Sequence, residues 1–330
     1  MVLAGVTLFL LVLVIAATVF IERATVDGLI AFNRDNAARA EALGRGGIQL
    51  AMALLLQDRI DEEEAQFRVD TRDDFWARVG GQTLEMPDGG TLRLRIEDSG
   101  ARINLNALFE GEAIRHDSME VFVTELLDKV IGELDPTSAD APYDAQELAQ
   151  NLIDWIDTDD VRLRGGPEDA YYQEQDPAYR AANRPLLSFQ ELGLVEGFDT
   201  TLIEALRPYA TVQPLVRGDG VNPNTAPSYV LATLYHGTSG DLRMANEDTV
   251  RDVLDIRARG GILCRDEAND ERCTPIRDVV PGEIIPPPTW TSEVFRVTAE
   301  ASYGSVQRTV EAVIDRSDVA DVRILDWRVR

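Results

Sequence analysis

The chemically most active part of this sequence is a dense group of carboxylates near its middle. Six acidic residues fall within 16 positions, on either side of a Gly-Gly-Pro turn: Asp154, Asp157, Asp159, Asp160, Glu168 and Asp169. Oxygen-only ligands on a flexible loop suit calcium, which takes about six to eight oxygens, better than zinc or copper. The spacing is not that of an EF-hand, because Val161 stands where that motif has a ligand and Arg162 where it has glycine. The alternative interpretation is a solvated acidic turn after a helix end.

The two cysteines, Cys264 and Cys273, enclose a short polar loop. Such a loop is typical of segments that a disulfide closes in an oxidising compartment, and two separate free thiols are the alternative. A zinc site would need further ligands, and the two histidines, His116 and His236, lie far away in the sequence. We expect both histidines at the surface or in turns.

The composition indicates an exported globular body with an acidic surface. Of the 330 residues 45% are apolar, which is enough for a sizeable core in one or two domains. The 58 acidic and 32 basic residues give a net charge of -26, which opposes a phosphate backbone and favours cations. The sequence therefore argues against nucleic acid as a partner. It also contains no nucleophile-elbow motif and no Gly-rich phosphate loop after a strand.

The N-terminal segment indicates where the chain resides. Residues 1–21 carry no charge, and a long amphipathic stretch follows with no break in helical pattern. About 20 apolar residues span a bilayer core of roughly 30 Å, so this is a membrane segment. A cleavable signal peptide fits poorly, because no basic residue precedes the apolar run and no loop follows it. A simple signal anchor leaves the helical prolongation over residues 37–56 unexplained, whereas a pilin-like subunit uses one helix as anchor and packing spine.

Alternating apolar residues predict the strands that would carry a body behind this helix. Residues 82–86 and 91–97 flank a Pro-Asp-Gly-Gly turn and predict a β-hairpin. Three later segments also alternate: 294–301, 307–314 and 322–329. These late strands need partners, and the early hairpin is the sheet that they would join.

Helical periodicity dominates the stretch between the hairpin and the late strands. Apolar positions spaced by three and four predict three helices: 119–131, 145–156 and 201–206. A charged break is expected over 58–74, and the proline-rich segment 281–288 is expected to be a stiff extended linker. The helical block is therefore predicted to be an insertion between strands of one sheet. We expect the segment 222–226 to cap a helix.

Four segments, in this order behind such an N-terminus, carry a family resemblance. They are 98–108, then 152–160 with 166–172, then 183–186 with 191–192, and finally 221–226 with 230–232. They resemble the type II secretion minor pseudopilin K family. The first segment resembles the family's junction between strand and insertion, and the second and third resemble its acidic signature and the continuation of that signature. The fourth resembles the start of its second helical subdomain. The resemblance runs over nearly the whole chain.

The resemblance implies an α+β fold. A pilin-like long N-terminal helix would pack on an antiparallel sheet, with a large all-α insertion of two SAM-like helical subdomains between strands. The implied parts are a membrane and filament-core helix over 1–21, its amphipathic continuation over 22–60, a pilin-like α/β domain over 75–105 and 289–330, and an inserted domain over 106–281, divided into 106–215 with the acidic loop and 221–281.

The resemblance also implies a function, that of a non-enzymatic subunit at the tip of the type II secretion pseudopilus. Such a subunit initiates the filament with the minor pseudopilins I and J, with H as a further candidate, through its N-terminal helix, and it supports protein export across the outer membrane. It is a single-pass inner-membrane protein with its bulk in the periplasm. Prepilin peptidase is a further expected partner, secreted substrates are candidates, and nucleic acid is not expected.

For the acidic loop, the resemblance implies a structural calcium ion. The expected ligands are Asp157, Asp159, Asp160, Glu168 and Asp169, and Asp154 is expected to support them from the preceding helix.

At the N-terminus, the resemblance implies processing by prepilin peptidase and methylation of the new end. Members of the family are made with a short basic leader, which this sequence lacks, so Met1 is taken as the mature first residue, with cleavage after Gly5 as the alternative. With Met1 first, Gly5 stands where most pilin-like subunits have glutamate. In other pilin-like subunits this glutamate is thought to pair with the N-terminal amine of the subunit above, and a subunit at the tip of the filament has no subunit above it.

A different class of function would use the same carboxylates. In a membrane-anchored periplasmic metal-dependent hydrolase, the residues of the 154–169 cluster would hold a catalytic cation that activates water. The sequence offers no evident companion base or substrate pocket for that reaction. The structural role is therefore the favoured interpretation.

Overall fold

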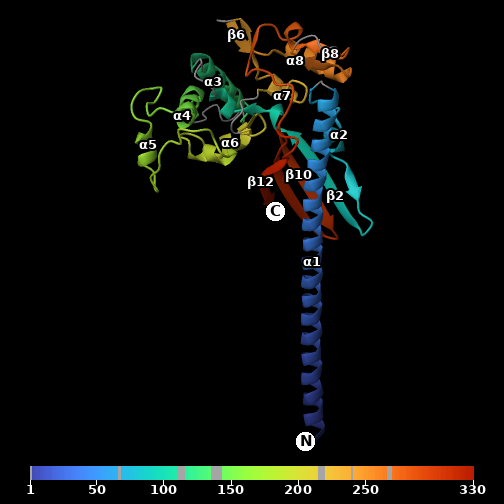
Figure 1. Ribbon diagram of the computed structural model, residues 1–330. Coiled ribbons are helices and arrows are strands. Elements are labelled where there is room, and N and C mark those ends of the chain that lie inside the picture. Colours follow the sequence, from blue (N-terminus) through green and yellow to red (C-terminus); the bar gives the residue numbers. More distant parts are fainter. Residues whose placement is uncertain are drawn as a thin grey trace.

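The longest element of the protein is a single N-terminal helix. The computed structural model describes residues 2–65, 68–109, 116–134, 143–214, 220–238, 241–265 and 270–330. Helix α1 runs from Val2 to Ala65, and its N-terminal half projects far beyond the rest of the molecule (Figure 1). The described side chains of this helix are exposed up to Asp35, and the first buried one is Asn36. The apolar half of α1 is therefore not covered by any other described part of the chain.

Helix α1 continues past the expected limit at residue 60. The charged segment from Asp58 onward remains helical to Ala65, so the break expected over 58–74 begins later. Asp58 and Glu62 lie one turn apart, and both face Arg316, which follows the last but one strand. This contact with a distant cation favours the helical conformation that the local charge pattern disfavours.

The second half of α1 packs on a five-stranded antiparallel sheet of order β1-β2-β10-β11-β12. The strands are Thr83–Glu85, Gly90–Asp98, Val294–Tyr303, Val306–Asp315 and Arg323–Val329. Strand β2 pairs with β10 along its length, from Gly90 opposite Tyr303 to Asp98 opposite Phe295. The prediction that the early hairpin joins the late strands is confirmed.

Close approach of α1 to the sheet depends on small residues. A Cβ at Gly47 would lie 3.1 Å from the Ala299 side chain, and one at Gly44 only 2.7 Å from a methyl group of Val310. The core beneath the helix is formed by residues from both partners: Ile48, Ala51, Leu55, Leu92, Leu94, Phe295, Val297, Ala312 and Ile314. The short helix α2, Phe75–Val79, adds Trp76 to this core.

The first half of the insertion is mainly helical, and it shares one hydrophobic core with the second half. It contains α3 (His116–Gly132), α4 (Ala145–Ile156), α5 (Asp169–Gln173) and α6 (Thr200–Leu206), with the 3-10 turns Ser99–Ala101, Asn106–Phe109 and Phe189–Leu194. The three helices predicted by periodicity are confirmed. Strand β3 (Ile103–Asn104) pairs in parallel with β4 (Ala210–Thr211), so the two ends of this half meet.

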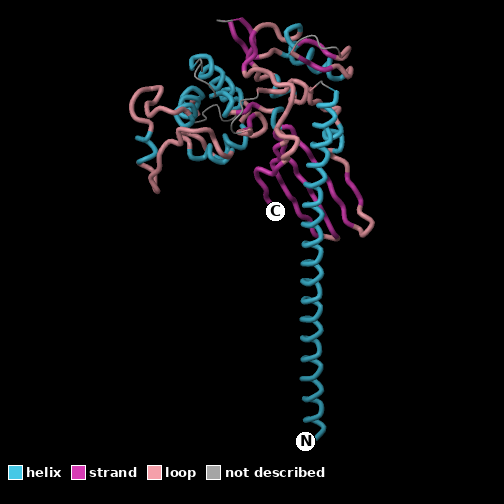
Figure 2. Tube along the Cα trace, viewed as in Figure 1, coloured by secondary structure: helices cyan, strands magenta, loops and turns pink. Residues whose placement is uncertain are grey.

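The second half of the insertion differs from the all-helical expectation. It contains helices α7 (Ser228–Leu231) and α8 (Glu247–Ala258), the 3-10 turn Ile276–Asp278 and five short strands. The strands are β5 (Tyr235–Thr238), β6 (Asp241–Met244), β7 (Ile262–Cys264), β8 (Cys273–Pro275) and β9 (Glu283–Ile285). Figure 2 shows them at the end of the molecule away from the N-terminus.

Two expectations about this second half were wrong. The segment 281–288 is more than a linker, because Glu283–Ile285 pairs as β9 with β5. His236 is not at the surface: it lies in β5, only 3% exposed, with its Nδ1 atom 3.2 Å from the carbonyl oxygen of Pro281. Short strands of this kind are stabilised by distant partners and leave little local signal in the sequence.

Candidate functional site

The acidic loop begins where helix α4 ends. Asp144 caps the start of α4 by accepting a hydrogen bond from the Glu147 amide at 3.0 Å, and Leu152 and Trp155 bury one face of the helix. After Ile156 the chain turns back on itself, with the Arg162 amide donating to the Gly166 carbonyl at 3.0 Å. This reversal returns the chain to the end of α4 just before α5 begins.

Three carboxylates meet at that point. Asp154, Asp157 and Glu168 each offer one oxygen, and these oxygens lie within 4.8 Å of one another. Asp154 is 3% exposed and Glu168 only 2%. One oxygen of Asp154 accepts a hydrogen bond from the Leu163 amide at 3.0 Å. Neither carboxylate oxygen of Glu168 has a hydrogen-bond partner among the described residues.

The electrostatics of this group favour a bound cation. Burial, followed by the neighbouring charges of Asp157 and Asp154, raises the pKa of Glu168 to about 7. Burial also raises the pKa of Asp154. Buried carboxylates without a counter-charge are unfavourable unless they are protonated or bind a cation. Oxygen-only donors of this kind match the ligands that calcium prefers.

The other expected ligands lie outside this group of three. Asp159 and Asp160 are exposed. One Asp159 oxygen accepts from the Val161 amide at 2.8 Å, and one Asp160 oxygen accepts from the Asn183 side chain at 3.3 Å. Asp169 accepts from the Ala181 amide at 3.0 Å and lies 3.7 Å from Arg180.

The structure thus places Asp154 within the carboxylate group itself, which the sequence did not suggest. It was expected only to support the ligands, but it lies in the group with Asp157 and Glu168. The i, i+3 spacing of the two aspartates at the end of a helix was the available signal, because residues three apart share a helix face.

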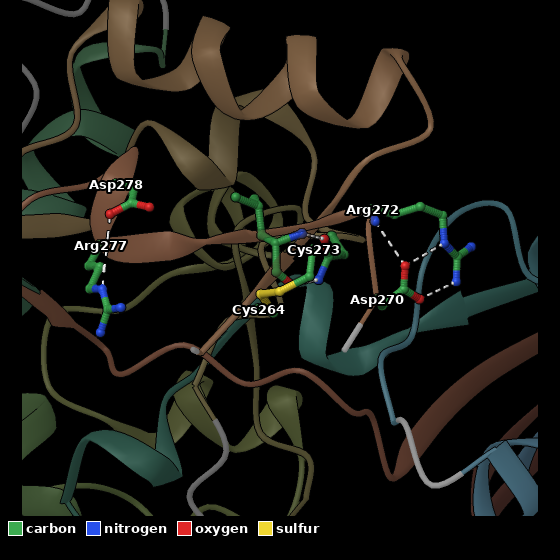
Figure 3. Close-up of a disulfide and its surroundings, with 8 residues drawn as sticks. Cys264, Asp270, Arg272, Cys273, Arg277 and Asp278 are labelled. Carbon is green, nitrogen blue, oxygen red and sulfur yellow. Dashed lines mark hydrogen bonds and ion pairs between the residues drawn. A yellow bond between two sulfur atoms is a disulfide. The ribbon is translucent and has the colours of Figure 1, made fainter. Parts of the chain in front are cut away.

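A disulfide joins Cys264 and Cys273, with their Cα atoms 5.8 Å apart (Figure 3). The two residues belong to β7 and β8, which pair in parallel with Ile262 opposite Cys273. Beside the bridge, Arg272 donates to Asp270 at 2.8 Å. The disulfide therefore links two neighbouring strands in the second half of the insertion.

A second charged cluster, which the sequence analysis missed, joins the helix to the sheet. Arg316 is buried and lies 2.7 Å from Asp58, bonds to Asp70, and donates to the Ser292 carbonyl at 3.0 Å. Its guanidinium carbon also lies 4.5 Å from the centre of the Phe295 ring. Burial alone would lower the pKa of Arg316, but the carboxylates of Asp70, Glu62 and Asp58 raise it, so the group stays charged.

The segment 222–226 extends this junction into the insertion. The Asn222 side chain donates to the Asp70 carbonyl at 3.1 Å, and the Thr225 hydroxyl bonds to the carboxylate of Asp98. The expectation that these residues cap a helix was wrong, because the next helix begins at Ser228 after Pro227. They connect the second half of the insertion to the pilin-like body.

The N-terminal expectations fall partly outside the described residues. Met1 is outside them, and Gly5 lies on the exposed part of α1 with nothing within 4 Å of an added Cβ. Helix α1 contains the one described stretch that is long and apolar enough to cross a membrane. Gly5 lies within that apolar stretch, at its N-terminal end.

These features define the class of the protein. A long, half-exposed N-terminal helix on an antiparallel sheet, with a domain inserted between two neighbouring strands, is a pilin-like architecture. The family model described as type II secretion system (T2SS), protein K matches residues 101–215.

Curated relatives and a solved structure agree with this match. Type II secretion system protein K of Pseudomonas aeruginosa is 28% identical over 85% of this chain and 77% of its own length. A putative type II secretion system protein K of Escherichia coli K12 is 29% identical over 66% of this chain and 62% of its own. A chain from the structure of the GspK-GspI-GspJ complex of enterotoxigenic Escherichia coli superposes with a TM-score of 0.64 at 20% identity, covering 91% of this chain and 99% of that one.

These similarities support a minor pseudopilin of the type II secretion system that resembles protein K of that system. The family is structural, and no finding favours the alternative of a metal-dependent hydrolase.

Proposed function

We propose that this minor pseudopilin occupies the tip of the type II secretion pseudopilus, where it initiates the filament with the I and J minor pseudopilins, and with H as a further candidate. The observation that carries the proposal is the division of α1. Its second half packs on its own sheet, whereas the described residues before Asn36 are exposed and mostly apolar. Such a surface is stabilised by lipid before assembly and by neighbouring helices after it, since each buried Å² of apolar area contributes about 25 cal/mol.

Two features, one at each end of the molecule, support the position at the tip. The insertion lies at the end away from the N-terminus, where it broadens the subunit (Figure 1). Gly5 carries no carboxylate into the apolar segment. A subunit with no neighbour above it has no N-terminal amine to neutralise, and an unpaired carboxylate in lipid would be costly.

The same proposal places the chain in the inner membrane, with its body in the periplasm. The disulfide between Cys264 and Cys273 supports an oxidising compartment. Processing by prepilin peptidase and methylation of the new N-terminus belong to this proposal, as do secreted proteins as candidate partners in export.

Copurification tests the assembly role. The full chain in detergent is expected to retain the I and J minor pseudopilins when all three are coexpressed. Leu29→Glu introduces a charge on the exposed part of α1, where the side chain is 58% exposed, and should reduce retention at least about tenfold. Val121→Glu changes a residue that is 50% exposed on α3 and serves as the matched control. Failure of the parent to retain either partner would contradict the proposal.

We further propose that a calcium ion binds the group formed by Asp154, Asp157 and Glu168. The proposal is supported by the two unpartnered oxygens of buried Glu168 and by the oxygen-only donor set. The ion would supply positive charge where three carboxylates converge. It would thereby hold the end of α4 against the start of α5 as a structural staple.

Thermal unfolding with excess calcium and with chelator tests this ion. A ligand that binds only the folded state stabilises it by about 2.7 kcal/mol at 100 times its dissociation constant. The calcium-dependent rise in melting temperature should be present in the parent, be lost in Glu168→Gln, and persist in Asp160→Asn, which changes an exposed carboxylate of the same loop. A parent that does not respond to calcium would refute the ion and leave the role in assembly intact.

A further inference from the structure

A polar cleft lies between the first half of the insertion and the outer face of the sheet, opposite α1. Its volume is about 380 Å³. The insertion contributes Arg207 and Gln213, and the sheet contributes Arg296 and Arg328. Three arginines in one cleft are unexpected in a chain whose net charge is -26.

Arg296 forms no ion pair with the described residues of this cleft. It lies on β10 between Glu97 of β2 and Val313 of β11. The Glu97 carboxylate pairs instead with Arg102, at 3.3 Å. Within the described part of the chain, no carboxylate lies within ion-pair distance of the Arg296 guanidinium. Burial lowers the pKa of Arg296, and the charges of Arg102 and Arg207 lower it further, whereas the carboxylates of Glu97 and Glu311 act in the opposite direction.

The neighbouring arginines are already held in place. Arg207 lies 4.9 Å from the centre of the Phe189 ring and 2.8 Å from Glu204. Arg328 pairs with Asp326 at 3.2 Å. Arg296 is therefore the one of the three whose charge is left without a protein partner, and Arg207 adds a second guanidinium across the cleft.

We propose that this cleft binds a carboxylate carried by an extended peptide segment of another protein. A guanidinium recognises a carboxylate through charge-assisted hydrogen bonds, and a single carboxylate matches the one arginine of the three that forms no ion pair. The carboxylates of Glu311 and Asp326 in the wall disfavour a more highly charged ligand such as phosphate. The amide of Gln213 and the apolar side chain of Leu325 offer contacts that suit a peptide backbone and its side chains. The inference does not depend on the position of the chain in a filament.

The overall charge of the chain makes the test specific. A chain with a net charge of -26 repels acidic peptides in general, so a preference for them must come from a local site. The probe is a fluorescein-labelled hexapeptide in which leucine and glutamate alternate, and its reference has glutamine in place of glutamate. Fluorescence anisotropy with the full chain in detergent gives both affinities at one salt concentration.

The parent should bind the glutamate peptide at least about tenfold more tightly than the glutamine peptide. Arg296→Gln should abolish this preference, whereas Arg93→Gln, at an exposed position on the same face of the sheet, should keep it. If Arg296→Gln fails to fold, Arg207→Gln on the opposite wall should also reduce the preference. Equal affinity of the parent for the two peptides, or an equal loss in Arg93→Gln, would overturn the proposal. Displacement of the peptide by inorganic phosphate at concentrations where acetate has no effect would assign the cleft to phosphate instead.

Discussion

One buried guanidinium connects the end of helix α1 and the segment after it with the chain before strand β10. Arg316 contacts Asp58 from helix α1, Asp70 from the segment after that helix, and the Ser292 carbonyl before strand β10. A buried ion pair adds little stability by itself, but removal of one partner leaves the other charge unpaired. The orientation of α1 on the sheet therefore depends on this residue.

Arg316→Met should destabilise the protein by about 3–5 kcal/mol, because Asp58 and Asp70 would lose their counter-charge. Urea denaturation measures this loss. Arg323→Met is the matched control: Arg323 pairs with Asp315 at 3.3 Å but its side chain is 55% exposed, so its loss should cost less than about 1 kcal/mol. Equal effects of the two changes would contradict the role assigned to Arg316.

Glu62 makes the same cluster sensitive to pH. Burial, followed by the charge of Asp70, raises the pKa of Glu62 to about 7 from an ordinary value of 4.5. The folded state therefore binds this proton more tightly than the unfolded state does. The resulting stability is fully present below pH 4.5 and is lost as the pH rises towards about 7.

Glu62→Gln should flatten the fall of the free energy of unfolding between about pH 5 and pH 7.5 by about 1–3 kcal/mol. Some slope should remain, because burial also raises the pKa of Asp74, to about 6. Urea titrations at several pH values measure the slope. Glu63→Gln, at a side chain that is 42% exposed, should leave it unchanged, and a parent without any slope would refute the assignment.

At the scale of elements, the sequence predicted what is local. Helix α4 and the late strands were predicted because their apolar residues repeat with a period that belongs to a single element. The strand Glu283–Ile285 was missed because it is short and gains its hydrogen bonds from β5, more than forty positions earlier. Asp154 was placed outside the ligand group because the direction of a side chain at a helix end depends on how the following loop folds.

The disulfide is the main covalent constraint within the second half of the insertion. Cys264→Ala combined with Cys273→Ala should lower the free energy of unfolding by roughly 2–3 kcal/mol, since a closed loop of this size restricts the unfolded chain. Thermal unfolding of the variant gives the effect. The parent under reducing conditions should reproduce it, and an unchanged melting temperature in both would show that the bridge does not constrain this unit.

At the scale of the whole molecule, the anchor and the body are separable. No described side chain before Asn36 is buried, so removal of residues 1–32 should leave the stability of the body within about 0.5 kcal/mol of the parent. The truncated protein should also remain in solution without detergent. A truncation to residue 50 should unfold the body, because it removes Ala40 and Ile48 from the core. Loss of stability on the first truncation would contradict this division of α1.

The sequence by itself determined the apolar helix, the strands of the sheet, the acidic loop and the family resemblance, because hydrophobic period, local charge and short motifs are properties of neighbouring residues. Only the tertiary structure decided that Asp154 joins Glu168, that Arg316 binds the end of α1, that Thr225 bonds to Asp98, and that Arg296 faces an open cleft. Each of these depends on which distant segments meet. The fold determines which residue pairs with a buried charge. Because the two residues are far apart in the chain, no local sequence pattern predicts their contact.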